Sequence, residues 1–203
     1  LDRSTTFLTD RIATDAQLGR PVVVFNPLAW ARSEAVTLDA TDLPDATGVV
    51  TSAGEPVPAQ MGTDAEGGKT LTFLPNDVPG AGWKTFYVTE SAAMASDLSV
   101  SEMHLENAHV RVELADGVVQ TIIEKATGTC LFAATDVAAV NEVFVWDDDG
   151  CPSQIRPVDF MGSAPVVARS SQAERTVRVV ESGPVRVAVE VAFAMAWGTF
   201  RQR

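Results

Sequence analysis

The feature that most constrains the fold is a long apolar row near the end of the chain. In the stretch PVRVAVEVAF, residues 184–193, every second residue is Val or Phe. Because side chains alternate between the two faces of a strand, this row lies on one face. Its members are Val185, Val187, Val189, Val191 and Phe193. A row of this length needs a broad second sheet above it, which predicts a large β-sandwich rather than a small barrel.

From Pro21 onward, the residue pattern is typical of β-strands, in which side chains repeat with a period of two. Runs of β-branched residues alternate with turns rich in Gly and Pro, and no later segment of ten residues has a convincing helical pattern. Asn26 precedes Pro27, which removes a backbone donor and ends or kinks the strand before it. The expected strands include residues 22–26, 34–38, 69–74, 83–88, 109–114, 118–124 and the segments on both sides of Ser182-Gly183-Pro184. The sequence therefore predicts an all-β fold.

The first nineteen residues have a different pattern. Thr5 and Thr6 can cap a short helix, Leu8 and Ile12 lie one turn apart on a single face, and Gly19 is a stop signal. Further along, residues 89–101 shift to Ala, Ser and Met without strong alternation, which indicates a linker with its boundary near residue 95. We therefore expect a helical segment over 1–19 and two β units over 20–94 and 95–203.

The net charge of the chain limits the classes of molecule that it can bind. The 203 residues carry a formal net charge of -12, which disfavours binding to nucleic acid or to an anionic membrane surface. A neutral ligand such as a sugar is not excluded. No apolar run reaches the length of about 18 residues that a membrane span needs, and no secretory signal is evident, so a cytoplasmic setting is expected. Cys130 and Cys151 show no CxxC spacing and are expected to be reduced and structural.

One stretch, VFVWDDDGCPS, combines an aromatic residue with consecutive carboxylates. Trp146 is followed by Asp147, Asp148 and Asp149, and sugar sites pair an aromatic platform with carboxylates that accept hydroxyl hydrogen bonds. The substrate-rim candidates are therefore Trp146, Asp147 and Asp149. A solvated acidic turn with Trp146 anchored in the core is the interpretation that we favour. A calcium loop is a third interpretation, but the run lacks the spaced ligands of such loops.

Other residues that could form a site have simpler explanations. His104 and His109 are five apart, which predicts opposite faces of a strand and no shared metal ion. A carbohydrate-binding stack could be built from four aromatic residues in or beside the strands, but aromatics in alternating strands are far more often core. These residues are Trp30, Phe73, Trp83 and Phe86. We therefore expect all four in the core and no metal site in this chain.

Five motifs occur in order between residues 21 and 191. They are VVVFNPLAWARSEAVTL, VPAQ, VPGAGWKTFYV, LENAHVRVELADGVVQTIIEKATG and ESGPVRVAVEV. Together they resemble the C-terminal β region of the family 38 glycoside hydrolases, the α-mannosidases. The resemblance implies that residues 1–19 end a helical bundle and that 20–94 form a small immunoglobulin-like β-sandwich. It also implies that 95–203 are the first, truncated part of a large galactose-mutarotase-like β-supersandwich.

The resemblance has consequences for chemistry. Similar enzymes are retaining glycosidases that use a carboxylate nucleophile, a second carboxyl as acid and base, and zinc held by His and Asp side chains. In the resembled family these groups belong to a catalytic domain in front of the region matched here. The chain is then expected to have no catalytic residue and no cofactor of its own, and to brace that catalytic domain beside a carbohydrate substrate.

A second function class stays open. The chain could be an autonomous carbohydrate-binding or adhesion module with an immunoglobulin-like front half. Against this, the closing stretch AMAWGTFRQR stops while a strand is still under way. The non-catalytic β portion of a hydrolase is the function that we favour.

Overall fold

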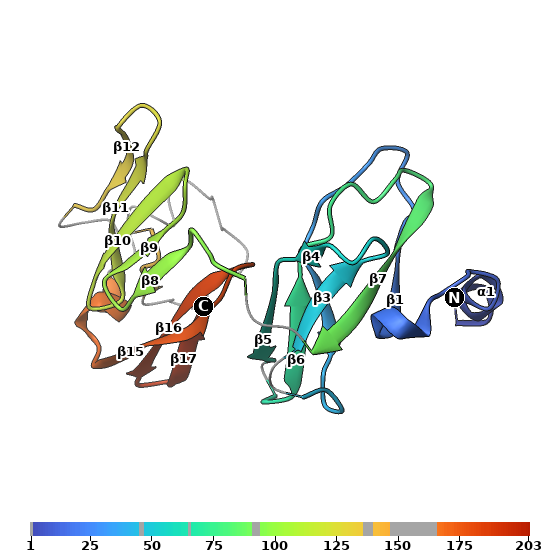
Figure 1. The fold of residues 1–203 in the computed structure, drawn as a ribbon. Coiled ribbons are helices and arrows are strands. Elements are labelled where there is room, and N and C mark those ends of the chain that lie inside the picture. Colours follow the sequence, from blue (N-terminus) through green and yellow to red (C-terminus); the bar gives the residue numbers. More distant parts are fainter. Residues whose placement is uncertain (1, 45–46, 65, 91–93, 136–139, 147–165) are drawn as a thin grey trace. The chain divides into compact units, whose positions relative to one another are not determined.

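The computed structural model describes residues 2–44, 47–64, 66–90, 94–135, 140–146 and 166–203. It divides the chain into two units. Unit 1 comprises Leu1–Asp97 with Gly183–Arg186, and unit 2 comprises Leu98–Ser182 with Val187–Arg203. Strands dominate both units, so the predicted all-β fold is confirmed (Figure 1). The assignment of 1–19, 20–94 and 95–203 to three named domains stays a prediction.

Unit 1 is a sandwich of two antiparallel sheets. One sheet has the strand order β1-β7-β3-β4 and the other has the order β2-β6-β5. The strands are β1 (Arg20–Asn26), β2 (Val36–Asp39), β3 (Thr47–Thr51), β4 (Pro56–Val57), β5 (Ala59–Thr63), β6 (Lys69–Phe73) and β7 (Gly82–Glu90). β1 ends at Asn26 directly before Pro27, as the sequence predicts.

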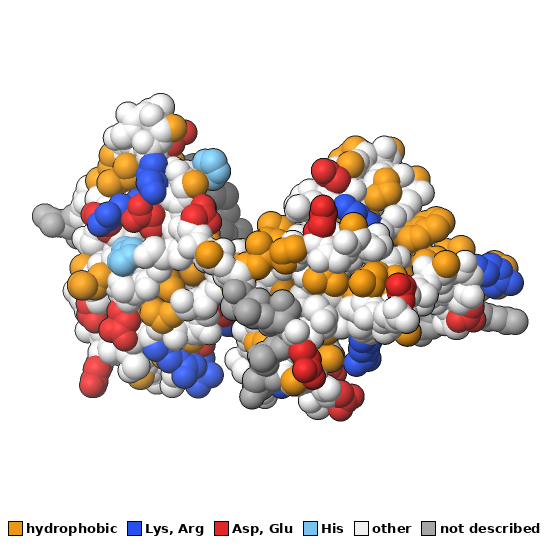
Figure 2. Space-filling model, in the orientation of Figure 1, with side chains coloured by type: hydrophobic (Ala, Val, Ile, Leu, Met, Phe, Trp, Pro, Cys, Tyr) orange, Lys and Arg blue, Asp and Glu red, His pale blue; other side chains and the backbone are white. Residues whose placement is uncertain are grey.

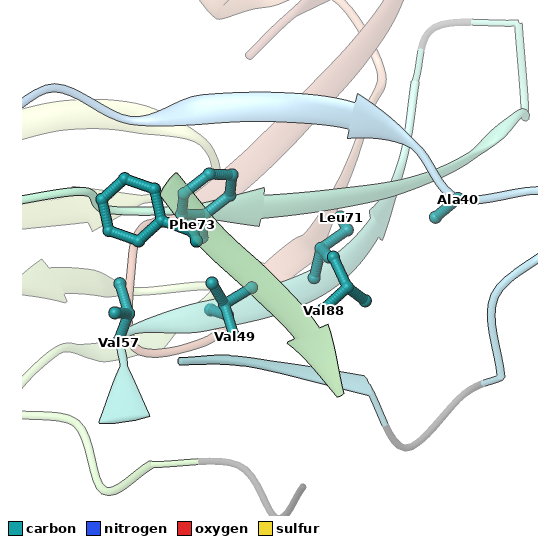
Figure 3. Packing of buried hydrophobic residues seen from close by; sticks show 8 residues of the cluster. Ala40, Val49, Val57, Leu71, Phe73 and Val88 are labelled. Carbon is teal, nitrogen blue, oxygen red and sulfur yellow. The ribbon is translucent and has the colours of Figure 1, made fainter. Parts of the chain in front are cut away.

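The core of unit 1 forms where alternating side chains of the two sheets meet. Figure 3 shows Val49 of β3, Val57 of β4 and Val88 of β7 grouped with Leu71 and Phe73 of β6. The Phe73 ring meets that of Phe86 in a tilted contact with 5.4 Å between the centroids. Burying such apolar side chains is the main driving force for closing the two sheets on each other.

The helical prediction for the N-terminal segment is only partly right. Helix α1 spans Asp2–Thr9, so Thr5 and Thr6 lie inside it and do not cap it, and Ile12 lies beyond its end. The Thr9 hydroxyl donates to the carbonyls of Thr5 and Thr6 at 3.1 and 3.0 Å and helps to satisfy the end of the helix. Gly19 does stop a helix, but that helix is the short 3-10 turn Ala16–Leu18.

Unit 2 contains three further sheets among the described residues. Their strand orders are β12-β11-β10-β9-β8, β13-β14 and β15-β16-β17. The strands are β8 (Ser99–Ser101), β9 (His104–Glu106), β10 (Val110–Ala115), β11 (Val118–Glu124), β12 (Thr129–Ala133), β13 (Phe144–Trp146), β14 (Val166–Arg169), β15 (Arg175–Ser182), β16 (Val187–Met195) and β17 (Gly198–Gln202).

The long apolar row near the end of the chain forms the core of unit 2. Val189, Val191 and Phe193 of β16 are buried, and Val100 of β8 and Leu105 of β9 pack against them. The row thus finds the second sheet that its length demands. Val185 does not belong to it, because the turn after Ser182 continues to Arg186 and β16 begins only at Val187. Instead, Val185 lies in unit 1, where its backbone N–H donates to the side-chain oxygen of Gln60.

The predicted linker is shorter than the compositional shift suggests. β7 continues to Glu90 and β8 begins at Ser99, so both ends of residues 89–101 belong to strands. Composition misses β8 because two of its three residues are serines, which alternate with a single valine. No helix in the described part of the chain has the length and apolar character needed to cross a membrane.

Candidate functional site

The sequence points first to Trp146, which lies at the end of β13. Its half-buried ring stacks on Phe144 with 5.6 Å between centroids, and the guanidinium of Arg169 lies 5.0 Å from the Phe144 centroid. The structure thus places Trp146 in a short aromatic and cationic cluster of unit 2. Asp147 and Asp149 lie outside the described residues, and the rim site stays a prediction.

The two histidines occupy different elements, and the prediction that they share a strand is wrong. His104 begins β9, whereas His109 lies in the turn before β10. Both ring nitrogens of His104 are within hydrogen-bond distance of serine hydroxyls, with Nε2 2.9 Å from Ser99 and Nδ1 2.8 Å from Ser101. His104 therefore ties β8 to β9 and has no ring nitrogen available for a metal ion in this arrangement.

Metal ligands do not cluster within the ranges that the structure describes. No group of three or more His, Cys, Asp or Glu side chains there is placed to hold a metal ion. Cys130, expected to be a reduced structural cysteine, is a free thiol on β12 and is exposed. Cys151 lies outside the described residues.

The four aromatic residues assigned to the core divide into two pairs. Phe73 and Phe86 are fully buried, as predicted. Trp30 and Trp83 are 63% and 51% exposed, so the prediction is wrong for both. Trp83 is on the face of β7 that points away from Phe86, and Trp30 belongs to the segment after β1. Alternation shows which residues share a face, but it does not show which face becomes the inside.

Both exposed tryptophans belong to the part of unit 1 that Asn26 organises. The Asn26 side chain is buried, and its Nδ2 donates to the carbonyls of Trp30 and Val78 at 2.7 and 3.1 Å. Its Oδ1 accepts a hydrogen bond of 3.1 Å from the backbone N–H of Leu28. A single amide side chain therefore shapes the turn after β1 and joins it to the segment before β7.

Backbone hydrogen bonds join the same two segments, the turn after β1 and the segment before β7, at a place that we call the junction. Arg32 and Val78 exchange backbone hydrogen bonds of 3.0 and 2.9 Å, and the N–H of Ala81 donates to the carbonyl of Leu28 at 2.6 Å. Gly80 lies so close to the Ala29 backbone that an added Cβ would come within 2.5 Å of it. The segment that carries Trp30 is thus fixed to the segment that leads into Trp83.

An open hollow of about 120 Å³ lies beside this junction. It is lined by Val24, Phe25, Asn26, Arg32, Glu34, Ala35, Val36, Pro75 and Val78. Phe25 also contacts Trp83, its cross-strand partner, with 6.4 Å between ring centroids. The hollow is therefore apolar except for Asn26, which is engaged in the junction, and the pair formed by Arg32 and Glu34.

The Arg32–Glu34 pair is the charged element of the hollow. The guanidinium donates to the carboxylate through both Nε and Nη2, and the Nε contact measures 2.9 Å. This hydrogen bonding raises the pKa of Arg32 and lowers the pKa of Glu34. Both groups stay ionised at neutral pH, so the charges lining the hollow cancel. We call this hollow the Asn26 site.

Sequence reasoning misses this site. The pair Asn26-Pro27 signals a strand end, but an asparagine before a proline gives no sign that its side chain will bind a backbone carbonyl 52 residues away. The usable signal is the Arg-x-Glu spacing shortly after the first strand. In an extended segment, residues two apart lie on one side of the chain, which permits an ion pair.

Comparison with family models and with curated proteins gave no match. Two solved structures are similar in fold. A protein in glycosyl hydrolase family 38 from Enterococcus faecalis matches with a TM-score of 0.57 and 15% identity, over 95% of this chain and 26% of that chain. An alpha-mannosidase from Enterococcus faecalis V583 matches with a TM-score of 0.56 and 15% identity, over 95% of this chain and 25% of that chain. This chain thus shares the fold of about a quarter of each structure.

Proposed function

We propose that this chain is the non-catalytic β region of an α-mannosidase-type retaining glycoside hydrolase and that it braces the catalytic domain. One observation carries the proposal. The fold likeness to a family 38 glycosyl hydrolase extends over 95% of this chain, so it involves both units rather than a single common sandwich. The five sequence motifs that resemble the same family support it independently.

The proposal assigns the chemistry to another part of the enzyme. Retaining glycosidases need two carboxyl groups about 5 to 5.5 Å apart, one as nucleophile and one as acid and base. In the proposed enzyme the catalytic domain supplies these carboxyl groups and the zinc ligands, and it is the partner of this chain. The present chain contributes a rigid support for the catalytic domain and the carbohydrate substrate.

The proposal also includes the segment that begins at Trp146. As the alternative to a solvated acidic turn, we propose that Trp146, Asp147 and Asp149 contribute to the rim of the sugar site in the whole enzyme. Asp147→Asn or Asp149→Asn then lowers catalytic efficiency by about 10 to 100-fold, with little change in melting temperature. Unchanged efficiency in both variants would remove the rim from the proposal and leave the bracing role in place.

The experiment compares this chain with the product of the complete gene. We expect the complete product to hydrolyse an aryl α-mannoside with zinc present, and the chain of residues 1–203 alone to show no turnover. The Enterococcus faecalis alpha-mannosidase provides a positive control for the assay. A complete product without any glycosidase activity would contradict the proposal. So would turnover by the isolated chain that is lost on mutating one of its own carboxylates.

A carbohydrate-binding module is the second candidate function. The observation that favours it is the exposure of Trp30 and Trp83 at 63% and 51%, since an exposed indole offers an apolar surface and an N–H donor to a ligand. The complete gene distinguishes the two functions, because a module needs no catalytic domain beside it.

A further inference from the structure

We propose that the outer face of the β1-β7-β3-β4 sheet in unit 1 is the surface on which the catalytic domain of the proposed enzyme docks. The open part of this face is formed by Val23, Phe25, Trp83 and Thr85, which we call the outer patch. The inference rests on the proposed function, because that function supplies the partner.

The strand register places the four side chains of the outer patch on one face of the sheet. Val23 of β1 pairs with Thr85 of β7, and Phe25 pairs with Trp83. The rings of Phe25 and Trp83 are in contact, with 6.4 Å between their centroids. Val24, which lies between Val23 and Phe25, packs against the core between the two sheets. Because successive side chains of a strand point to opposite faces, the outer patch points away from that core.

The composition of the outer patch differs from that of a face in contact with water. An antiparallel sheet with one solvated face carries polar side chains on that face. β2, an edge strand of the other sheet, follows this rule, because Thr37 and Asp39 point outward and are exposed. The outer patch has no charged residue, and its Trp83 is 51% exposed. Figure 2 shows hydrophobic side chains gathered over the region of β1 and β7 in unit 1. This composition is typical of a surface that another protein surface covers.

The N-terminal segment already covers one end of the same face. The 3-10 turn Ala16–Leu18 contacts both β1 and β7. Tyr87 is buried beside this turn, and its hydroxyl accepts a hydrogen bond of 3.0 Å from the backbone N–H of Asp15. Trp83 lies four residues earlier, about 13 Å along the strand. Within the described residues, therefore, the face is covered at the Tyr87 end and open at the outer patch.

The position of this cover favours the catalytic domain as the partner. In the proposed enzyme the catalytic domain precedes this chain, so its link to β1 passes through the segment that covers Tyr87. A domain tethered beside the outer patch has a high effective concentration there, so a modest apolar surface is sufficient to bind it. The similar structures have the length for such a domain, because this chain spans only 26% and 25% of them.

Two other occupants fit the outer patch less well. A second copy of the chain would bring together two molecules that each carry a net charge of -12 and repel each other. A saccharide needs several polar groups that fix its hydroxyls. The outer patch offers only the hydroxyl of Thr85 and the indole N–H of Trp83. An apolar face of a folded domain needs no such groups.

Photo-crosslinking of the product of the complete gene tests the inference. The photoreactive residue p-benzoylphenylalanine replaces Trp83 in one variant and Thr85 in another, so the test stays valid if one of them fails to fold. The matched control carries the same residue in place of Thr37, which is exposed on the outer face of the other sheet. We expect irradiation to join positions 83 and 85 to peptides of the catalytic domain, which mass spectrometry identifies. Position 37 should give no such product.

A pair of lysine substitutions in the same complete product provides a second readout. Docking would bury the ammonium group of Thr85→Lys without a partner, so this variant should shorten the half-life of glycosidase activity on heating about ten-fold. Thr37→Lys places the same group on an exposed position and should leave the half-life unchanged. Equal shortening in both variants would contradict the docking surface.

Three results of the crosslinking would also overturn the inference. They are no crosslink from positions 83 and 85 to residues outside 1–203, crosslinks that join two copies of the product, and an equal yield of domain crosslinks from position 37. The glycosidase assay separates this test from that of the proposed function. An active product without crosslinks from the outer patch to the catalytic domain contradicts the docking surface alone. An inactive complete product contradicts the proposed function and, with it, the identity of the partner.

Discussion

At the scale of single residues, the turn between β10 and β11 shows how one glycine can serve both the backbone and the core. Asp116 and Gly117 have φ values of 48° and 74°, as a two-residue hairpin turn with positive φ at both central positions requires. A Cβ at Gly117 would also lie 2.8 Å from both γ-methyl carbons of Val191 and 3.0 Å from one of Val177. The position is thus restricted by conformation and by space.

Gly128 provides the matched comparison for Gly117. Its φ of 70° is similar, but nothing lies within 4 Å of a Cβ built there. We expect Gly128→Ala to lower the free energy of unfolding by about 1 kcal/mol, from backbone strain alone. Gly117→Ala should lower it by about 2 to 4 kcal/mol, because strain and overpacking of the unit 2 core add. Urea denaturation of both variants measures the difference, and equal losses would mean that the core adapts freely.

At the scale of elements, ion pairs join three strands of the five-stranded sheet. Glu106 of β9 accepts a hydrogen bond of 2.7 Å from Lys125, which follows β11, and lies 3.5 Å from Arg111 of β10. The hydrogen bond from Lys125 is the largest cause of a lowered pKa at Glu106, and the charges of Lys125, Arg111 and His104 add to it. These pairs connect strands at the surface, where each contributes little free energy.

The lowered pKa of Glu106 makes its contribution dependent on pH. A carboxyl with a lower pKa in the folded state stabilises the fold above its unfolded pKa, and this stabilisation is lost as pH falls through the folded pKa. We expect Lys125→Met to raise the pKa of Glu106 toward the ordinary glutamate value. A carbon NMR titration of the Glu106 carboxyl measures this directly. Lys84→Met in unit 1 is the control, and an equal shift in both variants would contradict the assignment to Lys125.

At the scale of elements, the sequence predicts most of the long strands but misses a short strand and the direction in which one tryptophan points. A period of two predicts β6, β10 and β16, in which one face is apolar, and runs of β-branched and aromatic residues between turn signals predict β1, β7 and β11. It fails at β8, where Ser99 and Ser101 leave one apolar residue. It also fails at Trp83, because both faces of β7 carry large side chains and only the three-dimensional packing decides that Phe86 goes inside. The hydrogen bonds of Asn26 join distant segments, and no local pattern encodes them.

At the scale of the whole molecule, the segment that connects β7 to β8 is the expected first site of proteolysis. Residues 94–97 are exposed and belong to no strand, whereas β16 is paired with β15 on one side and β17 on the other. We expect a protease of broad specificity to cut between Met94 and Leu98 before it cuts within β16. Mass spectrometry of the first fragments identifies the site. Early cleavage inside β16 would show that unit 2 is not stably folded.

The edge position of β1 affects how the whole molecule behaves while it folds. β1 ends the strand order of its sheet, and its stretch Val22–Phe25 is uncharged, β-branched and apolar, which is the composition of an aggregating segment. Arg20 and Pro21 precede this stretch, and Asn26 and Pro27 follow it. Each proline lacks the N–H that an incoming strand would need, and the arginine adds charge. The residues that fix the ends of β1 thus also act as gatekeepers, limiting self-association of the newly made chain before its sandwich has closed.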